Sequence, residues 1–356
     1  MGRMAFLKSR LEQLFTGYFA AVMATGIVSI ALFLNGHVRL SNALFDIATT
    51  IYAVLIVLYV ARCAWFPRRV WSDLTNAARV NGYFTFIAGT DVLGMRFALG
   101  GHAGATVWFG IVGVTAWLLL TYFTMMFMIF YNQQTVDKVM NGSWLIVTVS
   151  TESVTTVATV LSDAYSSQAS WLLLTGTVFW AIGIVIYFLF MGFILYRLFF
   201  YPTRPMDLGP PNWINMGAMA ISTLAGARLI LSAGHSTLLI ETKPFLEGTT
   251  LVLWAWGTWW IPLLILIGIW KYGVHREPVR YEPSLWSMVF PLGMYTAATD
   301  TLSKVDGLHL LHELVSPGMW IALAAWTAVG VGYLWSWRGA LAARSATGAD
   351  NLSHGA

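Results

Sequence analysis

The chain has 356 residues, of which 58% are hydrophobic and 10% are charged, and it carries 18 tryptophans and a formal net charge of +4. A mean hydropathy of +0.68 excludes an ordinary soluble domain. We therefore predict an all-α integral membrane protein that has the lipid bilayer as a partner and no nucleic-acid partner. The single Cys63 excludes an internal disulfide and a multi-cysteine metal site.

Ten apolar stretches are long enough to cross a membrane. A helix of about 20 apolar residues spans the roughly 30 Å of hydrocarbon. The stretches of this length are 15–34, 44–66, 82–100, 105–131, 143–161, 170–196, 212–234, 246–270, 285–303 and 315–337. We predict ten transmembrane helices. Since ten is an even number, both termini should lie on one side of the membrane.

The basic residues indicate which side that is. Of the 20 Lys and Arg residues, 15 lie near the termini or the loops after even-numbered spans, and three lie in the opposite loops, at Arg39, Lys243 and Lys304. Cytoplasmic loops carry such an excess. We therefore predict a plasma (inner) membrane protein with a cytoplasmic N-terminus at 1–11, one transport domain at 12–338 and a disordered cytoplasmic tail at 339–356.

An aromatic residue stands near the start of every odd-numbered span, followed by small and hydroxyl residues. The steps between these aromatics are 65, 61, 69 and 73 residues, and the five are Tyr18, Tyr83, Trp144, Trp213 and Trp286. The even-numbered spans carry few polar residues. This repeat predicts five helical hairpins, with the polar odd helices inside around a central pore and the apolar even helices outside.

Five ionisable residues fall within the central parts of odd-numbered spans: Asp91, Arg96, Glu152, Arg228 and Asp300. A charged side chain at the centre of a membrane helix costs about 2.5–3.5 kcal/mol on insertion scales. We therefore expect all five to face the protein interior.

Three threonines, Thr25, Thr90 and Thr151, occur seven residues after their leading aromatics. Because a shared offset implies a shared depth, they predict a ring of hydroxyls that replaces part of an anion's hydration shell. The alternative is that each threonine forms a hydrogen bond across a helix contact.

Arg96, Arg228 and Asp300 lie 13 to 15 residues beyond their leading aromatics, toward the outer half of the membrane. Two arginines there could bind a carboxylate or an oxyanion through paired hydrogen bonds. The alternative is a structural network in which Asp300 and Asp91 neutralise the arginines.

Asp91 and Glu152 both lie eight residues after their leading aromatics, near the middle of the membrane. A carboxyl group at this depth could take up a proton during a transport cycle. Alternatively, Arg96 or neighbouring hydroxyls could satisfy each carboxyl group.

Pro291 follows Phe290 in the middle of the ninth span. A proline there removes one backbone hydrogen bond and usually kinks the helix. The kink could direct Phe290 into the pore as a plug, or it could serve packing alone.

Sites for a metal, a cofactor or catalysis are not expected. His309, His312 and Glu313 have helical spacing but fall in a short loop without a second cluster, and the chain holds no nucleophile or phosphate-binding motif. We therefore predict no cofactor, no metal site and no enzymatic activity.

Four stretches of the chain carry a family resemblance. They are 17–32 (GYFAAVMATGIVSIAL), 211–226 (PNWINMGAMAISTLAG), 253–264 (LWAWGTWWIPLL) and 290–299 (FPLGMYTAAT). The chain resembles the tellurite-resistance/C4-dicarboxylate transporter family, which includes plant slow-type anion channels, fungal malate permeases and sulfite exporters. The resemblance implies five hairpins around a quasi-five-fold pore, commonly a homotrimer with one pore per subunit, and a gating phenylalanine at the position of Phe290.

These observations lead to one expected function and two alternatives. We expect a transporter for small anions, with C4-dicarboxylates such as malate and succinate first, tellurite and sulfite next, and proton coupling as an option. The first alternative is a passive anion channel gated by Phe290. A membrane sensor or a membrane enzyme is the other class, which the absence of an output domain and of catalytic motifs argues against.

Overall fold

The computed structural model describes the backbone of residues 3–353 and the side chains of residues 7–336. Every regular element in this part of the chain is helical. Five helices are mostly buried and have moderately polar sequences: α2 (Ala20–Leu34), α5 (Phe84–Leu99), α8 (Ile146–Ala164), α10 (Ile214–Leu231) and α12 (Trp286–Leu302). We call them the inner helices.

The inner helices form a closed ring of contacts. In chain order α2 packs on α5, α5 on α8, α8 on α10 and α10 on α12, and α12 packs back on α2. The ring therefore joins the first and the last inner helix, which are far apart in the sequence.

Each inner helix is followed by a longer and more exposed helix, and the two pack together. These outer helices are α3 (Val38–Trp65), α6 (Ala103–Phe130), α9 (Ala169–Phe200), α11 (Thr237–Gly268) and α13 (Val315–Ser353). The most apolar windows of the outer helices are 17% to 33% buried, against 89% and 100% for the α10 and α8 windows. The polar helices are thus inside and the oily helices outside, because lipid accepts only the latter.

Short elements connect the pairs. They are the α-helices α1 (Arg3–Glu12), α4 (Pro67–Leu74) and α7 (Val136–Val139), the π-helical turn η7 (Ile269–Val274), and the 3₁₀ turns η1 (Val80–Tyr83), η2 (Gly142–Leu145), η3 (Ser166–Gln168), η4 (Pro205–Asp207), η5 (Pro210–Trp213), η6 (Ala233–His235), η8 (Pro283–Leu285) and η9 (His309–Leu314).

A buried ion-pair network fixes the turn from α3 into α4. The Arg62 guanidinium lies 2.5 Å from one carboxylate oxygen of Asp73, and Arg79 lies 2.8 Å from the other oxygen. Arg62 also donates a hydrogen bond to the carbonyl of Glu12. This network ties the end of the first helix pair to the N-terminal segment.

Seven helical segments are long and apolar enough to cross a membrane, so the chain is a multi-pass membrane protein. The seven lie at 38–65, 103–130, 142–164, 166–200, 210–231, 237–274 and 309–336. The predicted spans 15–34, 82–100 and 285–303 contain α2, α5 and α12, which are shorter, with 15, 16 and 17 residues. Non-α-helical turns occupy the first residues of these three windows, which shortens the α-helices.

Glycine permits one of these early turns. A Cβ on Gly82 would lie 2.8 Å from the backbone nitrogen of Gly17, closer than any real Cβ contact. The entries into α2 and α5 can therefore touch backbone to backbone only because Gly82 lacks a side chain.

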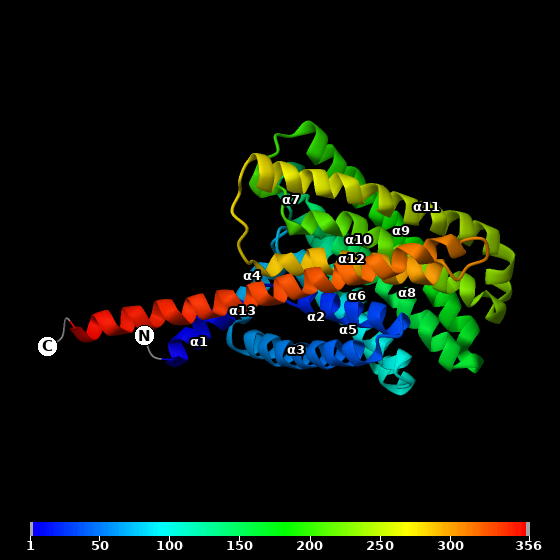
Figure 1. The fold of residues 1–356 in the computed structure, drawn as a ribbon, viewed down its shortest axis with the longest axis horizontal. Helices are drawn as coiled ribbons and strands as arrows, with labels where there is room; N and C mark the ends of the chain where they lie inside the picture. The colour runs from blue at the N-terminus through cyan, green and yellow to red at the C-terminus, as the bar shows by residue number, and fades with distance from the viewer. Residues whose placement is uncertain (1–2, 354–356) are drawn as a thin grey trace.

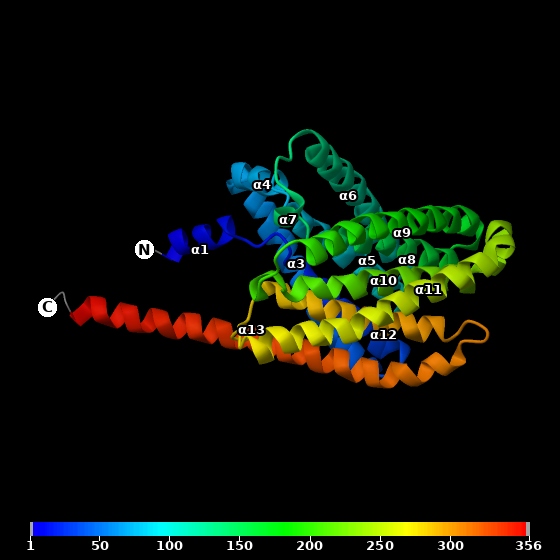
Figure 2. The ribbon, with the colours of Figure 1, turned by 90° about the horizontal axis from the view of Figure 1, so that it is seen from above.

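Both described ends of the chain lie at the same end of the molecule, as expected for an even number of spans (Figures 1 and 2). The helix α13 extends beyond the other helices there and continues to Ser353, through most of the segment that we predicted to be a disordered tail. Alanine, the strongest helix former, recurs through that segment. The boundaries of the transport domain stay a prediction.

Candidate functional site

Two fully buried carboxyl groups face glycines on the outer helices. Asp91 on α5 lies against Gly113 on α6, and Glu152 on α8 lies against Gly183 on α9. A Cβ added to Gly113 would come within 2.9 Å of Cγ of Asp91, and one added to Gly183 would come within 2.7 Å of Cδ of Glu152. Only glycine leaves room for the carboxyl groups at these two points.

A serine on the next inner helix completes each site. Ser153 Oγ on α8 donates to Asp91 Oδ2 at 2.6 Å, and Ser222 Oγ on α10 donates to Glu152 Oε1 at 3.0 Å. Asp91 Oδ1 and Glu152 Oε2 are buried without a hydrogen-bond partner among the described residues. Each carboxyl group thus has one satisfied oxygen and one oxygen that is free to bind a proton or another donor.

The two carboxyl sites are structural copies. Both acids stand eight residues after a leading aromatic, and both serines stand nine residues after the next one. The helix repeat therefore produces the same arrangement at two places. Sequence reasoning found the acids but missed the glycines and serines, although the shared offset of Ser153 and Ser222 was a usable signal.

Arg96 lies between the first two helix pairs. Its guanidinium donates to the hydroxyls of Ser29 and Ser41 and, at 2.7 Å, to Asn42 Oδ1. It also stacks 4.3 Å from the ring centre of Phe33. These partners are neutral, so the hydrogen bonds hold the guanidinium without cancelling its charge.

The other two charged residues predicted at this depth lie in separate networks. Arg228 is 3.6 Å from Asp163, while Asp300 binds Lys304 at 2.7 Å and lies 3.8 Å from His312. Asp91 and Asp300 therefore do not neutralise Arg96 or Arg228 in the described part of the chain, and that alternative is wrong. Of the two alternatives for Asp91, a neighbouring hydroxyl is the observed one.

The three threonines predicted to share a depth also share a pattern of contacts. Each donates its hydroxyl to the carbonyl four residues earlier in its own helix. Each also meets an aromatic side chain from the outer helix of the preceding pair: Trp326 with Thr25 at 2.9 Å, Tyr52 with Thr90 at 3.0 Å and Trp117 with Thr151 at 2.8 Å. These are hydrogen bonds across helix contacts, and a role of the threonines in a pore stays a prediction.

The same link recurs at the remaining two positions of the ring. Trp180 on α9 donates to the carbonyl of Ser222 on α10, and Trp254 on α11 donates to the hydroxyl of Thr299 on α12. Every outer helix is therefore tied to the next inner helix by an aromatic hydrogen bond.

Phe290 is 1% exposed, and its neighbour Pro291 packs against α10. A Cβ on Gly217 would lie 2.7 Å from Cγ of Pro291, so α10 and α12 approach closely beside Phe290. Phe290 as a gate stays a prediction.

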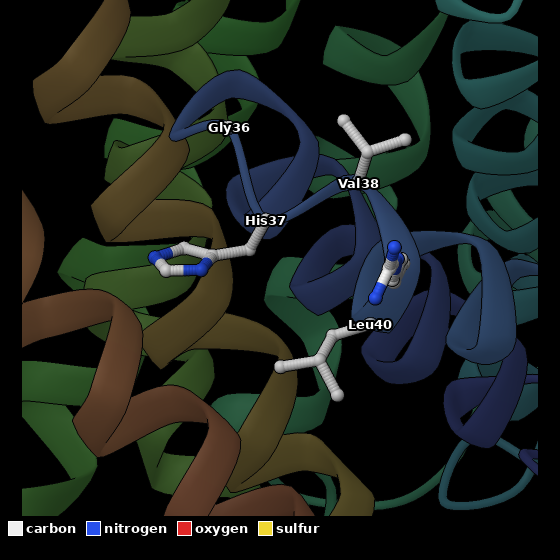
Figure 3. A pocket seen from close by; sticks show the side chains of 5 residues that line it. Gly36, His37, Val38 and Leu40 are labelled. Atoms are coloured by element: carbon white, nitrogen blue, oxygen red, sulfur yellow. The ribbon is translucent and has the colours of Figure 1, made fainter.

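A shallow cavity of about 390 Å³ lies at the turn between α2 and α3. It is lined by Gly36, His37, Val38, Arg39 and Leu40 (Figure 3). His37 points from this turn toward the last helix pair, where its ring meets Trp320 at 5.2 Å. Among the described residues, no three His, Cys, Asp or Glu side chains are grouped as metal ligands.

The sequence of the chain matches the family described as SLAC1, voltage-dependent anion channel, over residues 13–334, which include all five pairs of inner and outer helices. The chain belongs to this family. It is thus a member of a membrane transporter and channel family, and the resemblance noted from the sequence is confirmed.

Individual proteins of other organisms are also similar to this chain in sequence. The chain is 23% identical over 330 residues to an uncharacterized transporter of Methanocaldococcus jannaschii, which covers 90% of this chain and 94% of that protein. It is 24% identical over 319 residues to a second uncharacterized transporter of the same organism, which covers 87% and 89%. It is also 45% identical to an uncharacterized membrane protein of Mycobacterium tuberculosis over 138 residues, 39% of this chain and 70% of that protein.

Proposed function

We propose that the chain carries small anions across the plasma membrane, with both termini in the cytoplasm. C4-dicarboxylates such as malate and succinate are the first substrates to test, followed by tellurite and sulfite. The observation that carries this proposal is the closed ring of five inner helices, together with membership of an anion channel family.

In the proposed arrangement all ten long helices cross the membrane as five hairpins, and the axis of the inner ring is the path of the anion. The outer helices support this arrangement because their exposed surfaces are apolar. By analogy with the family, we propose a homotrimer with one pore in each subunit.

Positive charge would attract the substrate. Arg96 contributes a guanidinium whose hydrogen-bond partners are neutral, and Arg228 is held only at 3.6 Å by Asp163. We propose that these two residues raise the local concentration of anions in the outer half of the path. Thr25, Thr90 and Thr151 line the proposed path at one depth, and Asp300 with Lys304 marks its outer end.

We propose that Asp91 and Glu152 couple transport to protons. Each has a buried carboxyl oxygen without a partner, which a proton would occupy without breaking the bond to Ser153 or Ser222. Asp91→Asn and Glu152→Gln keep the serine contact and remove the titration. We expect acidic external pH to stimulate uptake by the parent protein, and this stimulation to disappear in the double variant while uptake at neutral pH persists.

A counterflow assay in proteoliposomes tests the substrate. Liposomes loaded with malate, succinate, sulfite, tellurite, nitrate or chloride are diluted into labelled malate, and exchange is measured against empty liposomes. Faster exchange with the dicarboxylates than with nitrate and chloride is expected. Equal exchange with every anion would refute the proposed selectivity.

A passive channel is the second candidate, and the complete burial of Phe290 beside Pro291 within α12 favours it. In a channel, Phe290→Ala opens the path and produces large anion currents without a pH gradient. In a coupled carrier the same variant produces little current, and uptake still follows the pH gradient. Phe190→Ala is a suitable control, because Phe190 is also buried but lies on the outer helix α9.

A further inference from the structure

A cavity of about 350 Å³ reaches Asp91 from the outer surface of the protein. It lies between the outer helices α6 and α9, with α8 beneath it, and Asp91 is the only charged residue in its lining. Its walls are mostly Val, Ile and Leu, and the exposed Thr115 and Thr175 stand at its rim. The full lining comprises Asp91, Val107, Gly110, Ile111, Val114, Thr115, Val154, Val157, Ala158, Leu161, Leu172 and Thr175.

The cavity exists because of one glycine. Gly113 and Gly183 hold equivalent places, each against the carboxyl group of its own pair. Gly110 stands three residues before Gly113 on α6, and Trp180 stands three residues before Gly183 on α9. Trp180 is 2% exposed and fills the space between its helix and α10. Gly110 leaves the corresponding space empty.

The residues that face Gly110 and Trp180 differ in size in the opposite sense. Gly110 faces Val157, which would lie 3.0 Å from an added Cβ, whereas Trp180 lies against Gly226. Val157 and Gly226 both stand 13 residues after a leading aromatic. The two interfaces are thus alternative solutions of one packing problem, and the cavity lies at the α6 interface.

The chemistry of the cavity selects its ligand. Asp91 Oδ1 is buried without a partner, while Oδ2 is used by Ser153. An apolar body would fill the walls, and a protonated nitrogen would give the Asp91 carboxyl group both a hydrogen bond and an opposite charge. An anion would meet the carboxyl group instead, so this cavity is not a place for the proposed substrate.

The rim of the cavity determines how a ligand arrives. Ile111, Thr115 and Thr175 are exposed on the outer side of these helices, which we expect to face lipid. A ligand dissolved in the bilayer can therefore enter sideways without passing through the ring of inner helices.

We propose that this cavity binds a lipid-soluble amine, with the apolar body between α6 and α9 and the ammonium group on Asp91. The site shares Asp91 with the proposed proton coupling, but its test measures binding alone, so failure of binding and failure of transport are distinguishable.

Binding of 1-aminoadamantane to the full chain in lipid nanodiscs, measured by calorimetry, tests the proposal. Adamantane-1-carboxylate is the probe of opposite charge. We expect saturable binding of the amine only. Asp91→Asn, which keeps the Ser153 bond, should weaken binding about 10- to 100-fold, whereas Glu152→Gln, the same change at the carboxyl group without a cavity, should leave the affinity within about twofold of the parent.

A second variant removes the cavity and keeps Asp91. Gly110→Trp with Val157→Gly copies the packing that Trp180 and Gly226 form between α9 and α10, and it should abolish binding in a protein that still elutes as the parent does. Equal affinities of the parent and Asp91→Asn, an equal loss in Glu152→Gln, or binding of the carboxylate probe would overturn the proposal. If the double variant fails to fold, the comparison of the amine affinities of Asp91→Asn and Glu152→Gln tests the proposal alone.

Discussion

Replacing Gly183 by alanine tests how tightly α9 packs over Glu152. The new methyl carbon would lie 2.7 Å from Cδ and 2.9 Å from Cγ of Glu152, where ordinary contact begins at 3.4 Å, so the two helices or the side chain must move by about 0.7 Å. Overpacking of this kind costs about 1–3 kcal/mol. Because the contact involves Cγ as well as the carboxyl group, rotation of the carboxyl group alone does not relieve it.

Gly192→Ala is the matched control. Gly192 lies on the same helix, and a Cβ there would have nothing within 4 Å. Alanine gains about 1 kcal/mol of helix propensity over glycine in both variants, so this gain cancels in the comparison. We expect Gly183→Ala to be about 1–3 kcal/mol less stable than Gly192→Ala, measured by unfolding in mixed detergent and SDS micelles with tryptophan fluorescence.

A double-mutant cycle isolates the contact. Glu152→Ala removes the atoms that the new methyl group meets, so Gly183→Ala should cost much less in that background, with a coupling energy of at least about 1 kcal/mol. Equal stability of the Gly183→Ala and Gly192→Ala variants, or additive effects in the cycle, would refute the packing argument.

Three further substitutions probe other contacts. Arg96→Lys loses the fork of hydrogen bonds and should cost about 1.5–3 kcal/mol, measured by the same unfolding assay. Asp73→Asn leaves the Arg62 guanidinium buried without its counter-charge and should cost about 3–5 kcal/mol, measured as loss of folded protein on gel filtration. Trp326→Phe removes one donor to Thr25 and should cost about 1 kcal/mol, measured by thermal unfolding.

Arg96→Lys and Trp326→Phe each have a matched control in the same chain. Arg68→Lys and Trp335→Phe change exposed residues of the same types, so both should stay within about 0.5 kcal/mol of the parent. A Trp326→Phe protein as stable as Trp335→Phe would show that the link between α13 and α2 contributes nothing. Arg96→Lys with parental stability would show that the guanidinium geometry is unimportant.

The repeat of leading aromatics was sufficient to predict which helices are inside, because polarity and period both survive in the sequence. Glu152 and Asp91 were predicted at one depth, and they are equivalent in the structure. An offset along a helix gives depth but not direction around the axis. Their contacts with Gly113 and Gly183 therefore depend on how the outer helices are rotated, which the local sequence does not reveal.

The threonines show the same limit. Their common offset was visible, but their aromatic partners are not equivalent in residue type: Tyr52, Trp117 and Trp326. Arg96 illustrates a further limit of prediction from the sequence. Its partners Ser41 and Asn42 both precede the predicted second span. A residue just outside one predicted span can therefore be the partner of a charged residue inside another span.

The bond from Trp326 to Thr25 joins residues 301 positions apart. During synthesis, α2 is made before the other long helices, yet two of its neighbours, α12 and α13, are made last. Until then one side of α2 lacks these packing partners. Assembly of this protein therefore ends where it began, and a chain that stops before the fifth pair leaves its first helix without the partners that hold it in the ring.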